Sequence, residues 1–231
     1  MSDVVIFDLD DTLYKEIDYL KSAYKEIASY ATQMSISRNE PTQIMEVKLY
    51  EVMLAAYKNG ENTFNALNDY TGLGLPIEDL IRIYHEHIPH ISLDDDVRYI
   101  LDKLKADGIM MGIISDGREL TQWNKIKALG LTKWINESCI IINTSADCYK
   151  PSPNGYDRLM YAVHALSKEK NLNFIYVGDN LKKDFIYPKQ KGWQTICLKD
   201  DGRNIHYQDF TTAPAEALPD KVVKSFKDII I

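Results

Sequence analysis

The chain has 231 residues, of which 45% are hydrophobic and 26% are charged, and its formal net charge is -7. These fractions are typical of folded globular proteins and exclude a disordered or fibrous chain. The acidic balance argues against a nucleic-acid partner, and no apolar run approaches the roughly 20 residues that span a bilayer. Three cysteines, Cys139, Cys148 and Cys197, have neither zinc-ligand spacing nor an even count, so we expect a reducing, cytoplasmic setting.

A short apolar run, Val4 to Phe7, precedes the polar sequence Asp8-Leu9-Asp10-Asp11-Thr12. An uninterrupted apolar run of this length predicts a strand that is buried on both faces of a sheet. The change to acidic residues marks the point where that strand ends.

From residue 15 to residue 91 the pattern is helical throughout. A first helix is predicted from an apolar stripe at helical spacing. That stripe consists of Leu20, Ala23, Tyr24, Ile27, Ala28 and Ala31. Pro41 is expected to begin a second helix, and Pro76 a later one. The buried face of this later helix is predicted to carry Ile77, Leu80, Ile81, Tyr84 and Ile88.

From Asp94 onward, strand and helix patterns alternate. The predicted strands are 109–114, 139–142, 174–177 and 195–198, followed by a terminal segment at 222–223. The helix that ends at Gly130 is predicted to bury Leu120, Trp123, Ile126 and Leu129. This alternation predicts an α/β fold with a Rossmann-like parallel sheet and helices on both faces. We expect a core domain of residues 1–14 and 92–231, interrupted by an all-helical domain of residues 15–91.

Polar residues stand directly after three of the predicted strands. They are Asp8, Asp10 and Thr12, then Ser115 and Asp116, then Asp179 and Asp184, and Lys150 precedes a further helix. Ligands bind at the carboxyl ends of strands in an open parallel sheet. The topology therefore predicts that carboxylates, hydroxyls and one ammonium group meet at one edge.

So many carboxylates would repel one another, since two unit charges 4 Å apart cost about 4 kcal/mol at an effective dielectric constant near 20. A divalent cation removes that cost, and carboxylate oxygens suit Mg²⁺. A cation, a lysine and hydroxyl groups together suit a phosphoryl group, whose transfer depends on positioning and charge neutralisation. Asp8 is then the candidate nucleophile, forming an aspartyl-phosphate, and Asp10 the candidate general acid and base.

Four motifs carry a resemblance to the haloacid dehalogenase (HAD) superfamily of phosphohydrolases. They are Asp8-x-Asp10-x-Thr12, Ser115, Lys150-Pro151-x-Pro153 and Gly178-Asp179-x4-Asp184, in this order. The position of the helical block resembles the subgroup whose helical cap lies between the first and second motifs. The resemblance implies a Mg²⁺-dependent phosphatase acting on a small phosphorylated metabolite. We expect neither nucleic acid nor a membrane as a partner, and a monomer or small homo-oligomer.

The resemblance implies a metal-binding or chemical role for four residues. Asp8 would be the nucleophile and a Mg²⁺ ligand. Asp10 would be the acid and base, with its backbone carbonyl as a second ligand. Asp179 would bind Mg²⁺ directly, whereas Asp184 would either orient Lys150 or bind a metal-bound water.

It also implies a set of phosphate-binding residues. Ser115 and Lys150 would bind the transferring phosphoryl group, and Thr12 would support the loop of the first motif. The backbone amides of Asp116 and Gly117 would add further donors.

Two other functions remain open at this stage. One is a sugar-phosphate mutase or phosphotransferase of the same superfamily, although Asp11 stands where the mutase branch commonly has glycine. The other is a receiver-like phosphoacceptor signalling module, which also carries aspartates, a hydroxyl and a lysine on a parallel sheet. In such modules the lysine comes last, whereas here Asp179 follows Lys150.

Several other polar residues have simpler interpretations. His85, His87 and His90 are interpreted as a surface face, because helix residues two apart do not face each other. Lys182 and Lys183 are interpreted as a solvent-exposed helix face. The residues just past the first motif are candidates for substrate contact, namely Tyr14, Lys15, Glu16 and Tyr19.

Overall fold

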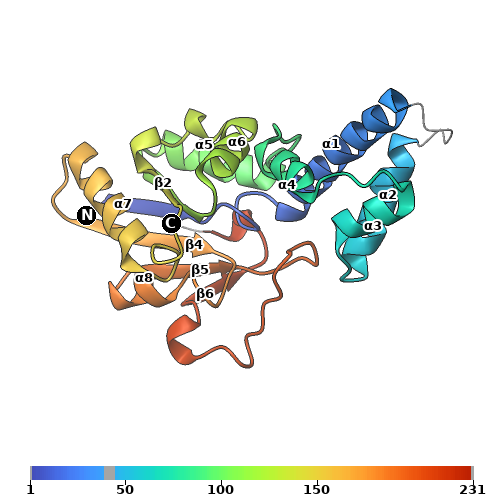
Figure 1. The fold of residues 1–231 in the computed structure, drawn as a ribbon. Coiled ribbons are helices and arrows are strands. Elements are labelled where there is room, and N and C mark those ends of the chain that lie inside the picture. The colour runs from blue at the N-terminus through green and yellow to red at the C-terminus, as the bar shows by residue number, and fades with distance from the viewer. Residues whose placement is uncertain (1, 39–44, 230–231) are drawn as a thin grey trace. The chain divides into compact units, whose positions relative to one another are not determined.

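The computed structural model describes residues 2–38 and 45–229 (Figure 1). The chain divides into two compact units, one made of Met1–Ile17 with Ser92–Ile231 and the other of Asp18–Ile91. The helix start predicted at Pro41 lies outside the described residues. In the described part of the chain, no helix is both long and apolar enough to cross a membrane.

The described residues of the larger unit contain a six-stranded sheet in the order β3-β2-β1-β4-β5-β6. The strands are β1 (Ser2–Phe7), β2 (Met110–Asp116), β3 (Ile140–Asn143), β4 (Leu172–Gly178), β5 (Gln194–Leu198) and β6 (Lys221–Val223). Every neighbouring pair is parallel. These pairings confirm the predicted parallel α/β sheet.

Strand β1 is central, with β2 on one side and β4 on the other. Its residues from Val4 to Phe7 have no exposed surface, as the apolar run predicts for a strand covered on both faces. The chain runs from β1 outward to β3 and then returns to β4 on the opposite side. The strand order therefore reverses between β1 and β4, and a ligand site is expected at the carboxyl ends of these strands.

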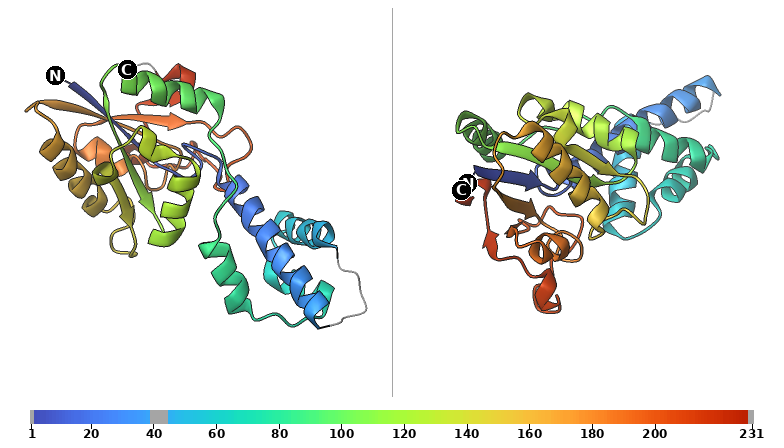
Figure 2. Two further views of the ribbon diagram at one scale, coloured as in Figure 1. Left: turned by 90° about the horizontal axis from the view of Figure 1, so that it is seen from above. Right: turned by 90° about the vertical axis from the view of Figure 1, so that its left-hand side faces the viewer.

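Four helices connect the strands and cover the sheet, as Figures 1 and 2 show. They are α5 (Asp95–Ala106), α6 (Glu119–Ala128), α7 (Pro153–Leu166) and α8 (Ile186–Gln190). Right-handed crossovers put α5 and α6 on one face and α7 and α8 on the other, because the chain changes direction across the sheet after β3.

In the smaller unit, the described residues form four helices joined by loops. Its helices are α1 (Glu16–Ser37), whose first two residues belong to the larger unit, α2 (Glu46–Lys58), α3 (Thr63–Thr71) and α4 (Ile77–Glu86). The apolar stripe predicted for α1 is buried along its whole length. Burying such a stripe supplies most of the stability of helices of this kind.

Two expectations for α4 are wrong. Of the predicted buried face only Leu80 is fully buried, whereas Ile88 is 78% exposed because the helix ends at Glu86, two residues earlier. His87 is buried instead of lying on the surface, and its Nδ1 is 3.0 Å from the carbonyl oxygen of Tyr84. Its ring also packs against Tyr19, at 4.8 Å between ring centres. Among the described residues, the one cluster able to hold a metal contains no histidine.

Candidate active site

The carboxyl ends of three central strands bring the predicted polar residues to one edge of the sheet. Phe7 is in register with Ile113 of β2 and with Val177 of β4, so β1 and β4 end at nearly the same level, whereas β2 continues to Asp116. Asp8 follows β1 directly, and Asp179 follows β4. The second motif differs slightly from its prediction, because β2 extends through Ser115 and Asp116.

The ammonium group of Lys150 connects the first and last motifs. Its Nζ donates to Asp8 Oδ1 at 2.5 Å, to Asp184 Oδ1 at 2.8 Å and to the hydroxyl of Tyr176 at 3.1 Å. Lys150, Asp8 and Asp184 are all buried. Burial opposes the charged form of Lys150, but the neighbouring carboxylates outweigh it and raise the pKa of this lysine well above its usual value. The contact between Asp184 and Lys150 is the geometry that one of the two roles expected for Asp184 requires.

Asp8, Asp179 and Asp184 form a buried acidic cluster in which one oxygen from each carboxylate lies within 4.8 Å of the others. Burial, followed by repulsion from neighbouring carboxylates, raises the pKa of Asp179 to about 9. Burial is also the main cause that raises the pKa of Asp8 to about 7, against the attraction of Lys150. Ligands about 2.1 Å from Mg²⁺ lie roughly 3 to 4 Å apart. The donor type, the spacing and the unbalanced charge therefore fit a magnesium ion.

Backbone groups and a glycine fix the position of Asp184 within this cluster. Its Oδ2 accepts hydrogen bonds from the backbone N–H groups of Asp179 at 3.1 Å and Asn180 at 2.8 Å. A Cβ atom at Gly178 would lie 2.6 Å from the same oxygen. Glycine at the end of β4 therefore leaves the space that the carboxylate occupies.

The carboxylate of Asp10 is not part of that cluster and has its own set of donors. Oδ1 accepts from the Tyr14 hydroxyl at 2.5 Å and from Lys125 Nζ at 2.7 Å, while Oδ2 accepts from Gln122 Nε2 at 2.9 Å. Burial alone would raise the pKa of Asp10, but the charge of Lys125 and these hydrogen bonds lower it. Tyr14, a candidate for substrate contact, thus contacts the expected acid and base.

Gln122 and Lys125 were not predicted as site residues because the buried face of α6 was assigned incorrectly. Leu120, expected inside, is 54% exposed, and Gln122 and Lys125 are buried instead. Helix periodicity identifies an apolar stripe, and it gives no signal when the buried face is polar. The available signal was the spacing of Gln122 and Lys125, which places two polar side chains on one face soon after the second motif.

The expected phosphate-binding residues lie together, but not all of their donors are free. Ser115 is buried, and its Oγ accepts from Gln122 Nε2 at 2.9 Å. The N–H of Gly117 donates to the backbone oxygen of Asn143 at 2.9 Å, so it is already engaged at the sheet edge. Thr12 is buried, and its hydroxyl has no hydrogen-bond partner among the described residues.

Lys183 belongs to the edge of the site, so its interpretation as part of a solvent-exposed face is wrong. Its Nζ lies 3.5 Å from Asp116 Oδ2, and the side chain is 31% exposed. Asp116 Oδ1 in turn accepts from the backbone N–H of Lys150 at 3.2 Å. The neighbouring Lys182 is exposed, as expected.

The loop between β5 and β6, residues 199–220, completes the site on the β4 side. Asn204 Nδ2 donates to Asp179 Oδ2 at 2.9 Å, and Gln208 Nε2 donates to the Asp179 carbonyl at 2.8 Å. The N–H of Ile205 donates to Asp11 Oδ2 at 2.9 Å, across 194 positions of sequence. No motif marks this loop, so these contacts were not predicted.

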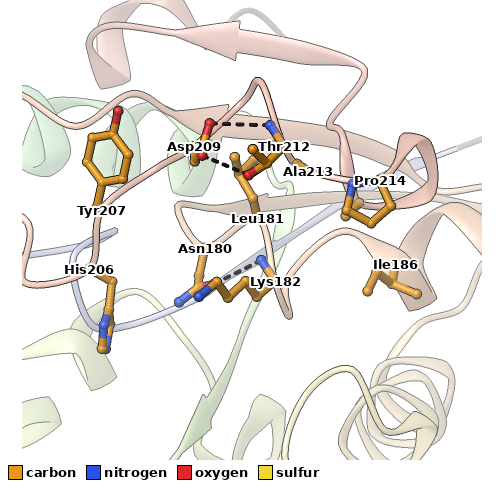
Figure 3. A pocket seen from close by; sticks show the side chains of 11 residues that line it. Asn180, Leu181, Lys182, Ile186, His206, Tyr207, Asp209, Thr212, Ala213 and Pro214 are labelled. Atoms are coloured by element: carbon orange, nitrogen blue, oxygen red, sulfur yellow. Dashed lines mark hydrogen bonds between the residues drawn. The ribbon is translucent and has the colours of Figure 1, made fainter.

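The same loop borders a pocket of about 520 Å³, shown in Figure 3. Asn180 and Lys182 line it from the loop after β4, and His206 and Tyr207 line it from the β5–β6 loop. Residues that line this pocket thus alternate along the loop with Asn204 and Gln208, which hold Asp179.

Asp8, the buried Lys150 and the acidic cluster lie together at the switch point of a Rossmann-like parallel sheet, an arrangement typical of proteins that bind a phosphate group beside a divalent cation. Residues 5–198 match the model of the haloacid dehalogenase-like hydrolase family, and the chain belongs to that family.

Curated relatives match over most of the chain. The glyceraldehyde 3-phosphate phosphatase of Pyrococcus furiosus is 27% identical over 204 residues, which are 85% of this chain and 80% of that one. The protein of the same name from Methanopyrus kandleri is 26% identical over 229 residues, 95% of this chain and 92% of that one. The predicted family and the predicted phosphatase-type enzyme are thereby confirmed.

Solved structures share the fold at lower identity. A HAD phosphatase from Thermococcus onnurineus has a TM-score of 0.57 at 18% identity, covering 98% of this chain and 95% of that one. A HAD hydrolase of family IA, variant 3, from Entamoeba histolytica has the same TM-score and identity, covering 100% and 96%. This likeness concerns the fold alone.

Proposed function

We propose that the chain is a Mg²⁺-dependent phosphatase that hydrolyses a small phosphate monoester through a phosphorylated Asp8. The observation that carries this proposal is the arrangement around Asp8. It lies at the end of the central strand, 2.5 Å from Lys150, and within the acidic cluster that it forms with Asp179 and Asp184. An aspartate so placed can be ionised and close to a phosphoryl group at the same time.

In the first half of the reaction, an oxygen of Asp8 attacks phosphorus while the bond from phosphorus to the alcohol oxygen breaks. Lys150 and the hydroxyl of Ser115 bind the phosphoryl oxygens. Asp8, Asp179 and Asp184 would hold the Mg²⁺, which when bound supplies the positive charge that the carboxylates and the phosphoryl group need. Asp10 acts as the acid in this half: it carries a proton when the substrate is bound and gives it to the departing alcohol.

In the second half, water attacks the phosphorus of the aspartyl-phosphate and restores the Asp8 carboxylate. Asp10, now ionised, takes the proton from that water, and inorganic phosphate leaves. Lys150 balances the charge of the Asp8 carboxylate before the attack and after hydrolysis, and its second pairing, with Asp184, holds it in place while Asp8 is phosphorylated.

The substrate we propose is a small phosphorylated metabolite of the triose phosphate type. The names of the relatives support it, since two of them are glyceraldehyde 3-phosphate phosphatases. We propose that the helical unit Asp18–Ile91 is the cap that selects the substrate, as in the family. We further propose that the enzyme works in the cytoplasm, as a monomer or small homo-oligomer, which its free cysteines allow.

The first test is the Asp8→Asn variant, which keeps the shape of the side chain and removes the nucleophile. Phosphate release from glyceraldehyde 3-phosphate and from 4-nitrophenyl phosphate is measured with and without Mg²⁺. We expect activity to fall by roughly a thousandfold or more, with an unchanged circular dichroism spectrum. Asp107→Asn, an exposed position after α5, is the control.

Turnover by Asp8→Asn at the rate of the control would overturn the nucleophile assignment. Transfer of phosphate to a sugar without its release would identify a phosphotransferase instead. Stable phosphorylation by acetyl phosphate without turnover would identify a receiver-like module.

A further inference from the structure

The polar face of α6 has no role in the mechanism described so far. Gln122 and Lys125 lie three positions apart on this helix and are 2% and 3% exposed. Buried polar and charged side chains destabilise a fold unless they are paired. Both side chains hydrogen-bond to the same carboxylate, that of Asp10.

We propose that Gln122 and Lys125 are positioning residues that hold Asp10 as the base for the second half of the reaction. This inference rests on the proposed function and adds two residues to it that no motif contains. Both residues act through Asp10, and Gln122 also contacts Ser115.

Lys125 fixes Asp10 by charge. Its Nζ is 2.7 Å from Asp10 Oδ1 and 3.7 Å from Glu16 Oε1, and its side chain is 3% exposed. An ammonium group removed from water needs a carboxylate close by. Water therefore does not replace Asp10 as the partner of Lys125, as it readily does in a surface ion pair. Because the Tyr14 hydroxyl donates to the same oxygen at 2.5 Å, Oδ1 of Asp10 is fully engaged.

Gln122 joins Asp10 to the phosphoryl-binding end of β2. Its Nε2 lies 2.9 Å from Asp10 Oδ2, 2.9 Å from Ser115 Oγ and 2.8 Å from the carbonyl oxygen of Asp116. Its own Oε1 is buried and has no hydrogen-bond partner among the described residues. An apolar side chain at this position would carry no unpaired oxygen, but it would also remove the donors to Asp10, Ser115 and Asp116. The amide donors of Gln122 explain the choice.

A carboxylate with donors on both oxygens is set to accept a proton at a defined position. That is the requirement of the second half-reaction, in which the bond from water to phosphorus forms, the bond from phosphorus to Asp8 breaks, and Asp10 receives the proton of water. In the first half-reaction, a substrate whose alcohol is a good leaving group does not need a proton from Asp10. Loss of the α6 contacts should therefore slow hydrolysis of the phosphorylated enzyme more than its formation.

The test compares Lys125→Met with Lys127→Met, an exposed lysine on the same helix. The substrate is 4-nitrophenyl phosphate, whose leaving group departs without protonation. For Lys125→Met we expect kcat to fall about a hundredfold, within the usual range for a displaced acid or base. We expect kcat/KM to fall less than about tenfold, because it reports only the steps up to phosphorylation. Rapid-quench measurements should show a burst of nitrophenol close to one per active site.

Two further variants guard against a simple loss of folding. Gln122→Leu removes the donors to Oδ2 and leaves the ion pair, so it should give the same burst with a smaller fall in kcat. Lys125→Arg keeps the charge and should recover part of kcat. Thermal denaturation of each variant checks that the fold remains.

A parallel fall of kcat and kcat/KM, with no burst in either Lys125→Met or Gln122→Leu, would overturn the inference. So would kinetics of Lys125→Met equal to those of Lys127→Met. If wild type is as inactive as Asp8→Asn on every monoester, the proposed function fails, and this inference fails with it. Wild-type turnover without a Lys125 effect would overturn the inference alone.

Discussion

Lys150 is the residue on which the charge balance of the site depends. It pairs with Asp8 and Asp184, neither of which is more than 2% exposed. The pKa of Asp184 is lowered although burial alone would raise it, because the charges of Lys150 and Lys183 outweigh burial. A buried charge that loses its partner is strongly unfavourable.

We therefore expect Lys150→Met to affect stability as well as activity. Without Mg²⁺ it should lower the free energy of unfolding by about 3 kcal/mol, the usual cost of breaking a buried ion pair from one side. Added Mg²⁺ should recover part of this loss by neutralising the same carboxylates. Urea denaturation with and without Mg²⁺ measures both effects, with the exposed Lys182→Met as the control. Equal stability of the two variants would contradict the expected charge balance.

For single residues, the sequence predicted the positions of those that stand directly at strand ends. Asp8 and Asp179 could be placed because their position depends only on where an apolar run stops. Lys125 and Asp10 could not be paired, because they are 115 positions apart and their contact depends on how α6 is rotated about its axis. Lys183 was likewise misplaced, since local sequence does not say that Asp116 lies opposite it.

At the scale of elements, strands and loops differ in how well the sequence specifies them. Strand β1 was predicted because two-sided burial demands a continuous apolar run. The β5–β6 loop has no such pattern, and its contacts with Asp179 and Asp11 join segments 25 and 194 positions apart. The contribution of this loop to the site therefore depends on long-range hydrogen bonds, which the local sequence does not predict.

The β5–β6 loop yields a prediction about metal binding. Asn204 bridges Lys15 and Asp179, accepting from Lys15 Nζ at 2.7 Å and donating to Asp179 Oδ2 at 2.9 Å. Groups that orient a metal ligand commonly change affinity 10- to 100-fold when removed. Asn204→Ala should therefore weaken Mg²⁺ binding by about tenfold in calorimetric titration.

His206→Ala is the matched control, because His206 lies on the same loop but lines the neighbouring pocket. We expect this variant to bind Mg²⁺ like wild type. Equal weakening in both variants would mean that the loop acts as a whole and that the Asn204 contact is not specific.

For the whole molecule, the acidic cluster links folding to pH and to metal. The folded state raises the pKa of Asp8 to about 7 and that of Asp179 to about 9, mainly through burial, from an ordinary value of 3.8. Between about pH 4 and pH 9, Asp8 and Asp179 bind more protons in the folded protein than in the unfolded chain. Their contribution to the free energy of unfolding therefore falls as the pH rises. The contribution of these two groups is fully present below about pH 4 and is lost as pH passes through their folded-state pKa values.

Magnesium should reverse this trend, because it binds the ionised carboxylates and replaces the protons. A ligand present at a hundred times its dissociation constant stabilises by about 2.7 kcal/mol. For a chain of this size that corresponds to a rise in Tm of roughly 5 to 10 °C. We expect a shift of this size near pH 9 and a much smaller one near pH 5, where protons compete for Asp8 and Asp179. Differential scanning calorimetry at the two pH values measures it. Asp179→Asn should lose most of the shift near pH 9, and a Mg²⁺ shift of equal size at both pH values would contradict a cation held by this cluster.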